Sequence, residues 1–248
     1  MKIQTTAQNK QAEKFYKKLQ KKFSRKINLN LSRIKFAIKN EQIHIDQKLN
    51  QKVLNIIGSD GKNTVLQSLK TILIQNKNNV TSFTSPAIIT PLDRIFLKNR
   101  YISLKNFKKF ANNIISSKVN LTLFECLTLI YLKSIKNIKK IDYHLIEAGC
   151  GFNKDSTNLF EMPRAQIITN LNVQHKKLLK AKNINDICKI KCGALSKKTT
   201  IYIGKQKPET LKIIKKIAEE HKKKLQGKKL ATFVSSYVKK ISKGLSKR

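Results

Sequence analysis

The sequence predicts an α/β fold in which a mainly parallel β-sheet is flanked by helices. Short β-rich runs alternate with longer segments of helical periodicity, and this alternation is typical of βαβ units. The chain has 248 residues, of which 40% are hydrophobic. That is enough for a sizeable core in one large α/β domain or two small ones.

Two helices are expected before the first strand. Phe15, Leu19 and Phe23 are apolar at every fourth position, which predicts a helix over residues 13–23. A second helix is expected over residues 30–39, with Ser32 as its cap. Five β-rich runs follow, at residues 53–58, 80–85, 144–149, 165–170 and 199–204. The further helical segments are residues 62–76, 104–117, 121–137 and 208–222.

The chain is strongly basic, with 53 Lys and Arg residues against 14 Asp and Glu and a net charge of +39. Clustered Lys and Arg release counterions from nucleic-acid phosphates, so a basic nucleic-acid-binding α/β module is one hypothesis. The charge is instead dispersed along the chain, beside an excess of Asn and Ile. We favour a compositional bias of an A/T-rich genome, together with a preference for anionic partners.

The cysteines and the hydropathy indicate a cytoplasmic chain without a membrane span. Cys126, Cys150, Cys188 and Cys192 occur without a secretory signal, which predicts reduced thiols. The spacing of Cys188 and Cys192 fits one turn of a helix. No run of 18 apolar residues is present. We expect residues 1–225 to form the main domain and residues 226–248 a basic amphipathic helix that docks on it.

The turn GSDGKNT, residues 58–64, lies between the first β-rich run and a helical segment. This arrangement directs backbone N–H groups and a helix N-terminus at an anion. Lys62 could then reach the β- and γ-phosphates of a nucleotide, with a nearby hydroxyl on Mg²⁺. The spacing departs from G-x-x-x-x-G-K-[ST], because Gly58 precedes Gly61 by three residues and Asn63 follows Lys62. By itself the turn fits a nucleotide site and a simple strand-to-helix connection equally well.

Other strand ends supply groups suited to phosphate or metal. Glu147 ends one predicted strand, Ser85 ends another next to Pro86, and His175 follows a third. The carboxyl ends of parallel strands are where α/β sheets bind ligands. We therefore expect these side chains to face the turn at residues 58–64.

Six segments resemble, in order, the motifs of one family. They are GSDGKNT (58–64), TSPAIITPLDRI (84–95), LTLFECLT (121–128), EAGCGFNKDSTN (147–158), TNLNVQH (169–175) and ICKIKCGA (187–194). They resemble the bifunctional folylpolyglutamate synthase/dihydrofolate synthase family of the Mur ligase superfamily, over about residues 12–222. The resemblance implies the P-loop-type central ATPase domain of that superfamily.

The resemblance also implies an activity, in which ATP drives the addition of L-glutamate to the carboxylate of dihydropteroate or a reduced folate through an acyl phosphate. The implied cofactors are ATP and Mg²⁺, with Lys191 carbamylated. The implied catalytic residues are Lys62, Glu147, His175 and Lys191. The implied phosphate loop is Gly58, Ser59, Asp60, Gly61, Lys62, Asn63 and Thr64. The implied metal ligands are Thr64, Ser85, Glu147 and His175. The implied pterin-side residues are Pro86, Thr122, Phe124, Glu125 and Asp155.

The sequence departs from the family motifs at several positions. Asp60 replaces an Asn, Gln174 the Asp before the metal His, Ala87 a His, Asn153 an Arg, and Ile190 the Glu before the carbamylated Lys. The family's second, Rossmann-like domain is expected to be absent, since about two dozen residues follow the matching region. We therefore expect a truncated ligase, one completed by a domain in trans, or an inactive ATP-binding remnant.

Overall fold

The computed structural model describes residues 6–24, 28–98, 100–196 and 199–222. One sheet organises this part of the chain, with the strand order β4-β3-β2-β5-β1-β6-β7. The strands are β1 (Val53–Ile57), β2 (Val80–Phe83), β3 (Ile95–Lys98), β4 (Arg100–Tyr101), β5 (Tyr143–Glu147), β6 (Ala165–Ile168) and β7 (Thr200–Ile203). Strands β2, β5, β1, β6 and β7 run parallel, whereas β3 and β4 are antiparallel. The predicted fold class is confirmed.

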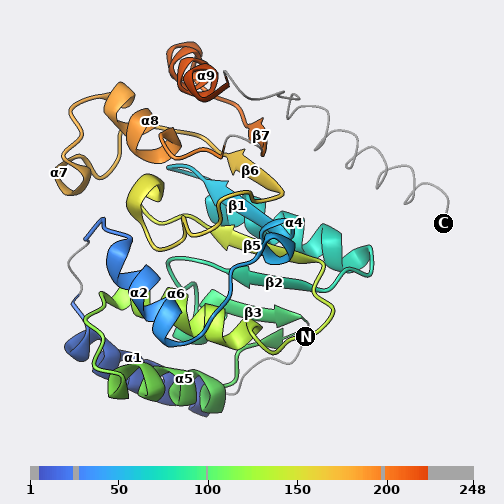
Figure 1. Ribbon diagram of the computed structural model, residues 1–248, viewed down its shortest axis with the longest axis vertical. Coiled ribbons are helices and arrows are strands. Elements are labelled where there is room, and N and C mark those ends of the chain that lie inside the picture. The colour runs from blue at the N-terminus through green and yellow to red at the C-terminus, as the bar shows by residue number, and fades with distance from the viewer. Residues whose placement is uncertain (1–5, 25–27, 99, 197–198, 223–248) are drawn as a thin grey trace.

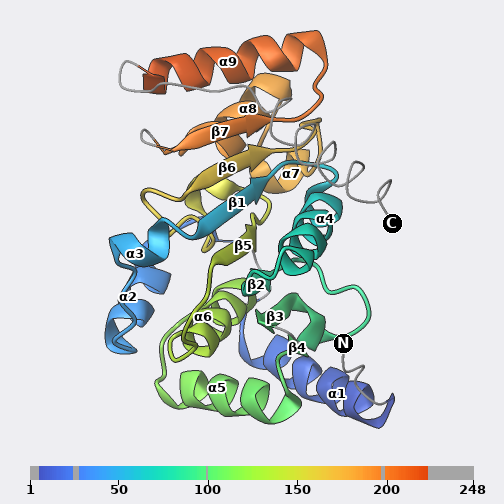
Figure 2. The same cartoon turned by 90° about the vertical axis from the view of Figure 1, so that its right-hand side faces the viewer.

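Helices cover both faces of this sheet (Figure 1, Figure 2). They are α1 (Thr6–Lys22), α2 (Ser32–Asn40), α3 (Gln47–Asn50), α4 (Lys62–Gln75), α5 (Leu104–Ser116), α6 (Leu123–Ile135), α7 (Lys176–Leu179), α8 (Ile184–Cys192) and α9 (Pro208–Lys222). On one face α4 packs against β1, β2 and β5. On the other face α6, with α1, α2 and α5, covers the β2–β3 side, and α8 and α9 cover the β6–β7 side.

The central strands are buried because they have neighbours on both edges and helices on both faces. Every residue of β1, β2 and β6 is buried. Such strands read as continuous apolar runs rather than alternating ones. In β1, Leu54 and Ile56 contribute to the core beneath α4, and Ile57 contributes to the core beneath α8. Strand β1 ends at Ile57, and the turn that follows it lies at the edge of the sheet where the predicted site residues gather.

The five predicted strands and the helices predicted up to residue 222 are present, with shifted boundaries. Helix α1 begins at Thr6 rather than at residue 13. The prediction of Ser32 as a cap is wrong, because Ser32 is the first helical residue and its N–H donates to the side chain of Asn30, at 2.8 Å. Strands β3 and β4 and the short helices α3 and α7 were not predicted. Cys188 and Cys192 both lie in α8, as their spacing suggested.

Two further expectations concern the C-terminal segment and the absence of a membrane span. The amphipathic helix expected within residues 226–248 lies outside the described residues. None of the helices in the described part of the chain combines the length and the apolar character that crossing a bilayer requires.

A buried hydrogen-bonded histidine joins β5 to β2. The Nδ1 atom of His144 lies 2.7 Å from Thr81 Oγ1, which lies 2.8 Å from the hydroxyl of Tyr131. Burial, and the nearby charge of Lys52, lower the pKa of His144 from 6.5 to about 4. The folded state therefore disfavours the protonated imidazole.

This histidine is expected to make stability pH-dependent. Between pH 6.5 and 4 the unfolded chain binds a proton at His144 and the folded chain does not, so stability present above pH 6.5 is lost as the pH falls. The loss is of the order of 3 kcal/mol, from about 1.4 kcal/mol per pKa unit. Urea unfolding of the wild type and His144→Gln at pH 4.5 and 7 measures it. Equal pH dependence in the two proteins would contradict the prediction.

Candidate active site

The turn between β1 and α4 has the backbone of an anion-binding loop. Gly61 has φ +77°, a left-handed conformation that favours glycine, and it precedes the first residue of α4. The first N–H groups of a helix have no intrahelical acceptor, so those of Lys62, Asn63 and Thr64 are available to a ligand. The Nζ atom of Lys62 bends back to the carbonyl of Ser59, at 3.1 Å.

Gly58 begins this turn in a place where no side chain fits. A Cβ atom built on Gly58 would lie 1.8 Å from Thr169 Oγ1. That hydroxyl donates to the carbonyl oxygens of Asp60, at 2.6 Å, and Ile57, at 3.2 Å. The close approach of β1 and β6 at their carboxyl ends therefore requires glycine at position 58.

The same turn is attached to the segment that follows β6. The N–H groups of Ser59 and Asp60 donate to the carbonyl of Asn170, at 2.9 and 3.2 Å. The Ser59 hydroxyl donates to the carbonyl of Asn172, and the Asn172 N–H donates back to that hydroxyl. The N–H groups of Ser59 and Asp60 are thus occupied within the protein, and the anion-binding groups are those from Gly61 onward.

A cavity of about 310 Å³ lies beside the turn and brings together residues from both predicted halves of the site. The predicted residues that line it are Ser59, Lys62, Ser85, Pro86, Thr122, Phe124, Glu125, Asp155, His175 and Lys191. The predicted residues that do not line it are Gly58, Asp60, Gly61, Asn63, Thr64 and Glu147. The lining also includes Asn28, Leu29, Cys150 and Ser156, which were not predicted.

Glu147 lies at the end of β5, buried, behind the Ser85 wall of the cavity. Its Oε2 accepts the N–H of Ser85 at 3.2 Å, and the side chain of Asn63 also bonds it. Burial raises the pKa of Glu147, against the opposing effects of those hydrogen bonds and of Lys62 and Arg94. A bound cation would relieve the same desolvation.

Three of the predicted metal ligands, Thr64, Ser85 and Glu147, offer oxygen donors, which suit a hard cation, and the fourth, His175, offers an imidazole nitrogen. Among the described residues no three His, Cys, Asp or Glu side chains gather closely enough to hold a metal by themselves. The Ser85 hydroxyl accepts a hydrogen bond from Arg94 Nη1 at 3.2 Å. The protein donor set thus fits a Mg²⁺ ion that takes most of its ligands from phosphate and water.

Lys191 is a buried amine between the turn and the segment after β5. Its Nζ donates to the carbonyls of Cys150, at 2.8 Å, and Gly58, at 3.1 Å. Burial, with the repulsion of Lys62, lowers the pKa of Lys191 from 10.5 to about 8. The amine therefore has an accessible neutral form, in which it can act as a nucleophile.

Asp155 is a buried carboxylate with unfilled acceptor capacity. Its Oδ1 accepts the N–H of Thr157 at 2.8 Å and also the Thr157 hydroxyl. Its Oδ2 is buried and accepts no hydrogen bond from a side chain among the described residues, with only the backbone N–H of Gly149 close by. Burial raises the pKa of Asp155, an effect that Thr157, Lys191 and the nearby N–H of Gly149 oppose. Asp155 is one of the lining residues, so it can serve as an acceptor for a ligand in the cavity.

Phe124 supplies the aromatic part of the cavity wall. Its ring packs against that of Phe83, with centroids 5.9 Å apart. Its edge lies so near Gly149 that a Cβ atom there would approach it to 2.9 Å. An aromatic face beside a buried carboxylate suits a flat heterocycle that carries N–H donors.

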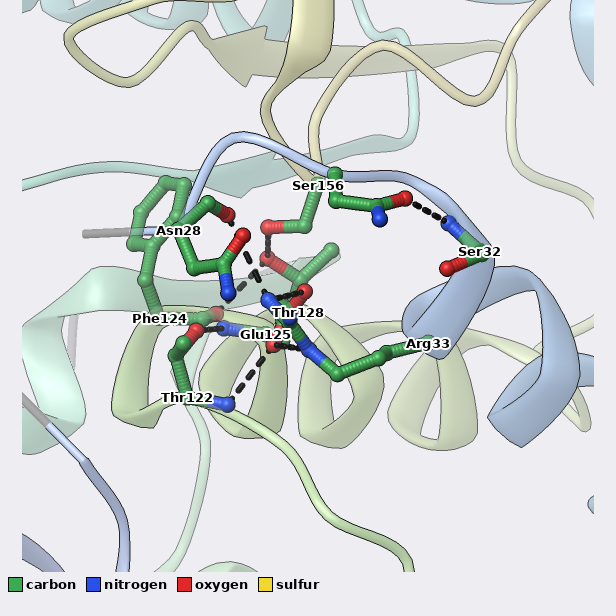
Figure 3. Close-up of polar contacts among 9 residues, drawn as sticks. Asn28, Ser32, Arg33, Thr122, Phe124, Glu125, Thr128 and Ser156 are labelled. Carbon is green, nitrogen blue, oxygen red and sulfur yellow. Dashed lines mark hydrogen bonds and ion pairs between the residues drawn. The ribbon is translucent and has the colours of Figure 1, made fainter. Parts of the chain in front are cut away.

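Glu125 is held by an ion pair that sequence reasoning missed (Figure 3). Arg33 donates through Nη2 to Oε1 at 2.9 Å and through Nε to Oε2 at 3.2 Å. The Thr122 N–H donates to Oε2 at 2.6 Å, which completes a capping box at the start of α6. Both carboxylate oxygens thus have protein donors, and the carboxylate helps to position the start of α6 in the cavity wall. The capping-box spacing was visible in LTLFECLT, whereas nothing in the sequence pairs Arg33 with Glu125.

Comparison with known proteins shows similarity to folate-type synthases in sequence and in fold. No family model matches the chain. The dihydrofolate synthase/folylpolyglutamate synthase of Bacillus subtilis is 27% identical over 186 residues, which are 72% of this chain and 42% of that protein. The structure titled "E.coli FolC in complex with DHPP and ADP" is 22% identical, has a TM-score of 0.75, and covers 88% of this chain and 51% of the other. The predicted family resemblance is confirmed.

A third similarity involves a folylpolyglutamate synthase of Mycobacterium tuberculosis complexed with ADP. It has a TM-score of 0.68 at 18% identity and covers 90% of this chain and 50% of the synthase. The chain thus spans about half the length of the synthases that it matches. Their likeness at this identity establishes the fold, and the roles of individual residues rest on the geometry described above.

Proposed function

We propose that this chain is the ATP-binding part of a ligase that joins L-glutamate to the carboxylate of dihydropteroate or a reduced folate. The observation that carries the proposal is that one cavity is lined both by Lys62 and by Phe124 and Asp155. A cavity that is lined by a phosphate loop on one side and by Phe124 and Asp155 on the other can hold a nucleotide beside an aromatic acid. The similar proteins include one solved with DHPP and ADP.

The reaction requires two anions to meet. The substrate carboxylate attacks the γ-phosphate to form an acyl phosphate and ADP, and the amino group of glutamate then displaces phosphate to form the amide. Lys62 and the N–H groups from Gly61 to Thr64 would hold the transferred phosphoryl group and neutralise its charge. Their positions at the start of α4 support this role.

Mg²⁺ would supply further neutralisation of the phosphates. Glu147, Thr64, Ser85 and His175 are the residues that we propose to hold it. Two observations support this. Burial raises the pKa of the Glu147 carboxyl, so a nearby cation would stabilise its charged form, and His175 lines the cavity. Glu147 would also keep Ser85 in place through the N–H···O bond described above.

Lys191 would complete the cation-binding side of the site after reaction with CO₂. A neutral amine attacks CO₂, loses a proton and becomes an anionic carbamate. The lowered pKa of Lys191 supplies the neutral amine near neutral pH, and the adjacent Lys62 would stabilise the negative product. This modification converts a buried cation into a carboxylate that can bind metal.

The pterin ring would stack on Phe124 and donate hydrogen bonds to Asp155. The buried Oδ2 of Asp155 supports this, since it accepts no side-chain hydrogen bond among the described residues and a buried acceptor gains from a donor that a ligand supplies. Thr122 and Pro86 would line the same end of the cavity, and Glu125 would hold the wall through Arg33.

The remaining contacts, including those to glutamate, would come from a second domain in the same polypeptide or in trans, because the matched synthases are about twice as long as the chain. Cys126, Cys150, Cys188 and Cys192 are free thiols, which supports a reducing compartment such as the cytoplasm. We propose no nucleic-acid partner, since ATP and polyglutamylated folates already account for a basic surface.

Phosphate release tests the proposal. The purified chain is incubated with Mg-ATP, L-glutamate and either dihydropteroate or tetrahydrofolate, with each component omitted in turn. Release that requires both glutamate and a pterin is the expected result. ATP binding without release in a folded chain would contradict independent ligation and show that the second domain is required. A folded chain that binds no Mg-ATP would overturn the proposal.

A further inference from the structure

Two side chains join the phosphate loop to the segment that carries His175. The Oδ1 atom of Asp60 accepts a hydrogen bond from Gln174 Nε2 at 2.7 Å, and its Oδ2 accepts one from Asn172 Nδ2. A carboxylate can only accept, so both amide groups must present their NH₂ ends to it. Asp60 thereby joins the turn before α4 to the segment after β6.

The negative charge of Asp60 has no cationic partner in this arrangement. Among the ion pairs of the described residues, Arg33–Glu125 and Lys133–Glu41, none includes Asp60. The neighbouring Lys62 directs its Nζ to the carbonyl of Ser59 instead. Two neutral amides therefore satisfy an exposed carboxylate at the tip of a loop whose neighbouring N–H groups suit an anion.

Gln174 immediately precedes His175, at a point where the backbone is unusual. His175 has φ 55° and ψ 31°, a left-handed conformation that costs a non-glycine residue energy unless its surroundings hold it. Its carbonyl accepts the N–H of Leu179 on the far side. The bond from Gln174 to Asp60 restrains the near side, so the place of the imidazole in the cavity depends on it.

Both partners are positions where this sequence departs from the family motifs. The motifs have Asn where Asp60 stands and Asp where Gln174 stands. In this sequence the pair consists of one carboxylate and one amide and carries one negative charge. Its two members are 114 positions apart in sequence and meet in one hydrogen bond.

We propose that Asp60 and Gln174 form a positioning pair that fixes His175 relative to the phosphate loop, and that either arrangement of one carboxylate and one amide supports it. The inference rests on the proposed function, since it assigns the pair a role in the nucleotide site. The pair is a positioning device because neither side chain lines the cavity itself.

Charge exchange tests the pair in the full chain. Gln174→Asp places two carboxylates against each other, whereas Asp60→Asn/Gln174→Asp restores one carboxylate and one amide in the reverse order. The control for added charge is Gln47→Asp, an exposed position at the start of α3. The measurements are the affinity for a fluorescent ATP analogue with Mg²⁺, the ¹H–¹³C NMR signal of the His175 ring, and thermal unfolding.

Gln174→Asp is expected to weaken analogue binding about tenfold and to shift the His175 signal. The magnitude is that of the interaction energy between side chains in direct contact. The double variant is expected to bind within about threefold of the wild type and to regain the His175 signal. Gln47→Asp is expected to leave both unchanged.

The outcomes separate two kinds of failure. If the wild type binds the analogue and the double variant is no better than Gln174→Asp, the positioning pair is overturned. The same holds if Gln174→Asp binds normally with an unchanged His175 signal. If the folded wild type binds no analogue, the proposed function fails, while the His175 signals of the three variants still decide whether the pair positions that ring.

Discussion

Replacing Lys62 by alanine is expected to weaken Mg-ATP binding by at least about tenfold and to abolish phosphate release. A hydrogen bond to a charged group contributes about 1.5–3 kcal/mol, and one such contact to phosphate would be lost. The fold should persist, because Lys62 is only half-buried and its one side-chain hydrogen bond goes to the Ser59 carbonyl. Isothermal titration with ATP and Mg²⁺ measures the affinity.

The matched control is Lys215→Ala on the exposed face of α9, which removes the same charge from a different helix. It is expected to bind ATP as the wild type does at 150 mM salt, where exposed charges beyond about 8 Å are screened. Equal loss in both variants would show that general positive charge, rather than the loop, attracts the nucleotide.

A second substitution, Gly58→Ala, is expected to destabilise the protein by about 2 kcal/mol or more, as overpacking of a buried site does. The added Cβ would lie 1.8 Å from Thr169 Oγ1, so either this hydroxyl must rotate away or the backbone must shift. Both movements break the hydrogen bonds of the Thr169 hydroxyl to the Ile57 and Asp60 carbonyls, and a backbone shift also separates β1 from β6 at their carboxyl ends. Urea unfolding measures the free energy.

The companion variant tests the cause. Thr169→Ala removes the oxygen that clashes. In the double variant the Cβ atom of residue 58 would lie 3.1 Å from the Cβ atom of residue 169, a contact that a small shift relieves. Gly58→Ala/Thr169→Ala is therefore expected to be more stable than Gly58→Ala, although Thr169→Ala alone loses two hydrogen bonds. Additive losses in the double variant would show that the Thr169 hydroxyl is not the obstacle.

The sequence predicted the parallel strands well because their signals are local. A buried strand such as β1 is mostly apolar in sequence. Glu147 is the last residue of β5, Ser85 lies just after β2, and His175 lies in the segment after β6. The shared edge of a parallel sheet then brings them together without knowledge of side-chain contacts. Family motifs added the pterin-side residues, of which Phe124 and Asp155 line the cavity with Lys62.

What the sequence did not predict depends on partners far along the chain or on unusual backbone. Strands β3 and β4 pair antiparallel, and Lys98 at the end of β3 has φ 63°, a left-handed conformation that a lysine in the sequence does not predict. Arg33 and Glu125 are 92 residues apart, so no pattern within a helix pairs them. Ser32 resembled a cap by composition, but the side chain of Asn30 accepts its N–H instead.

The strand order has a consequence for how this protein is made. Leu54 in the central strand pairs with Leu145 on one side and with Ala165 on the other. At a ribosomal rate of about 5–20 residues per second, these partners are synthesised roughly 5–20 s after Leu54. Throughout that interval an apolar strand with two unpaired edges leaves the exit tunnel with nothing to pair with, a situation that favours aggregation. Residues 53–57 therefore lack their pairing partners until residue 168 has emerged, and we expect this segment to be the most exposed to aggregation during synthesis.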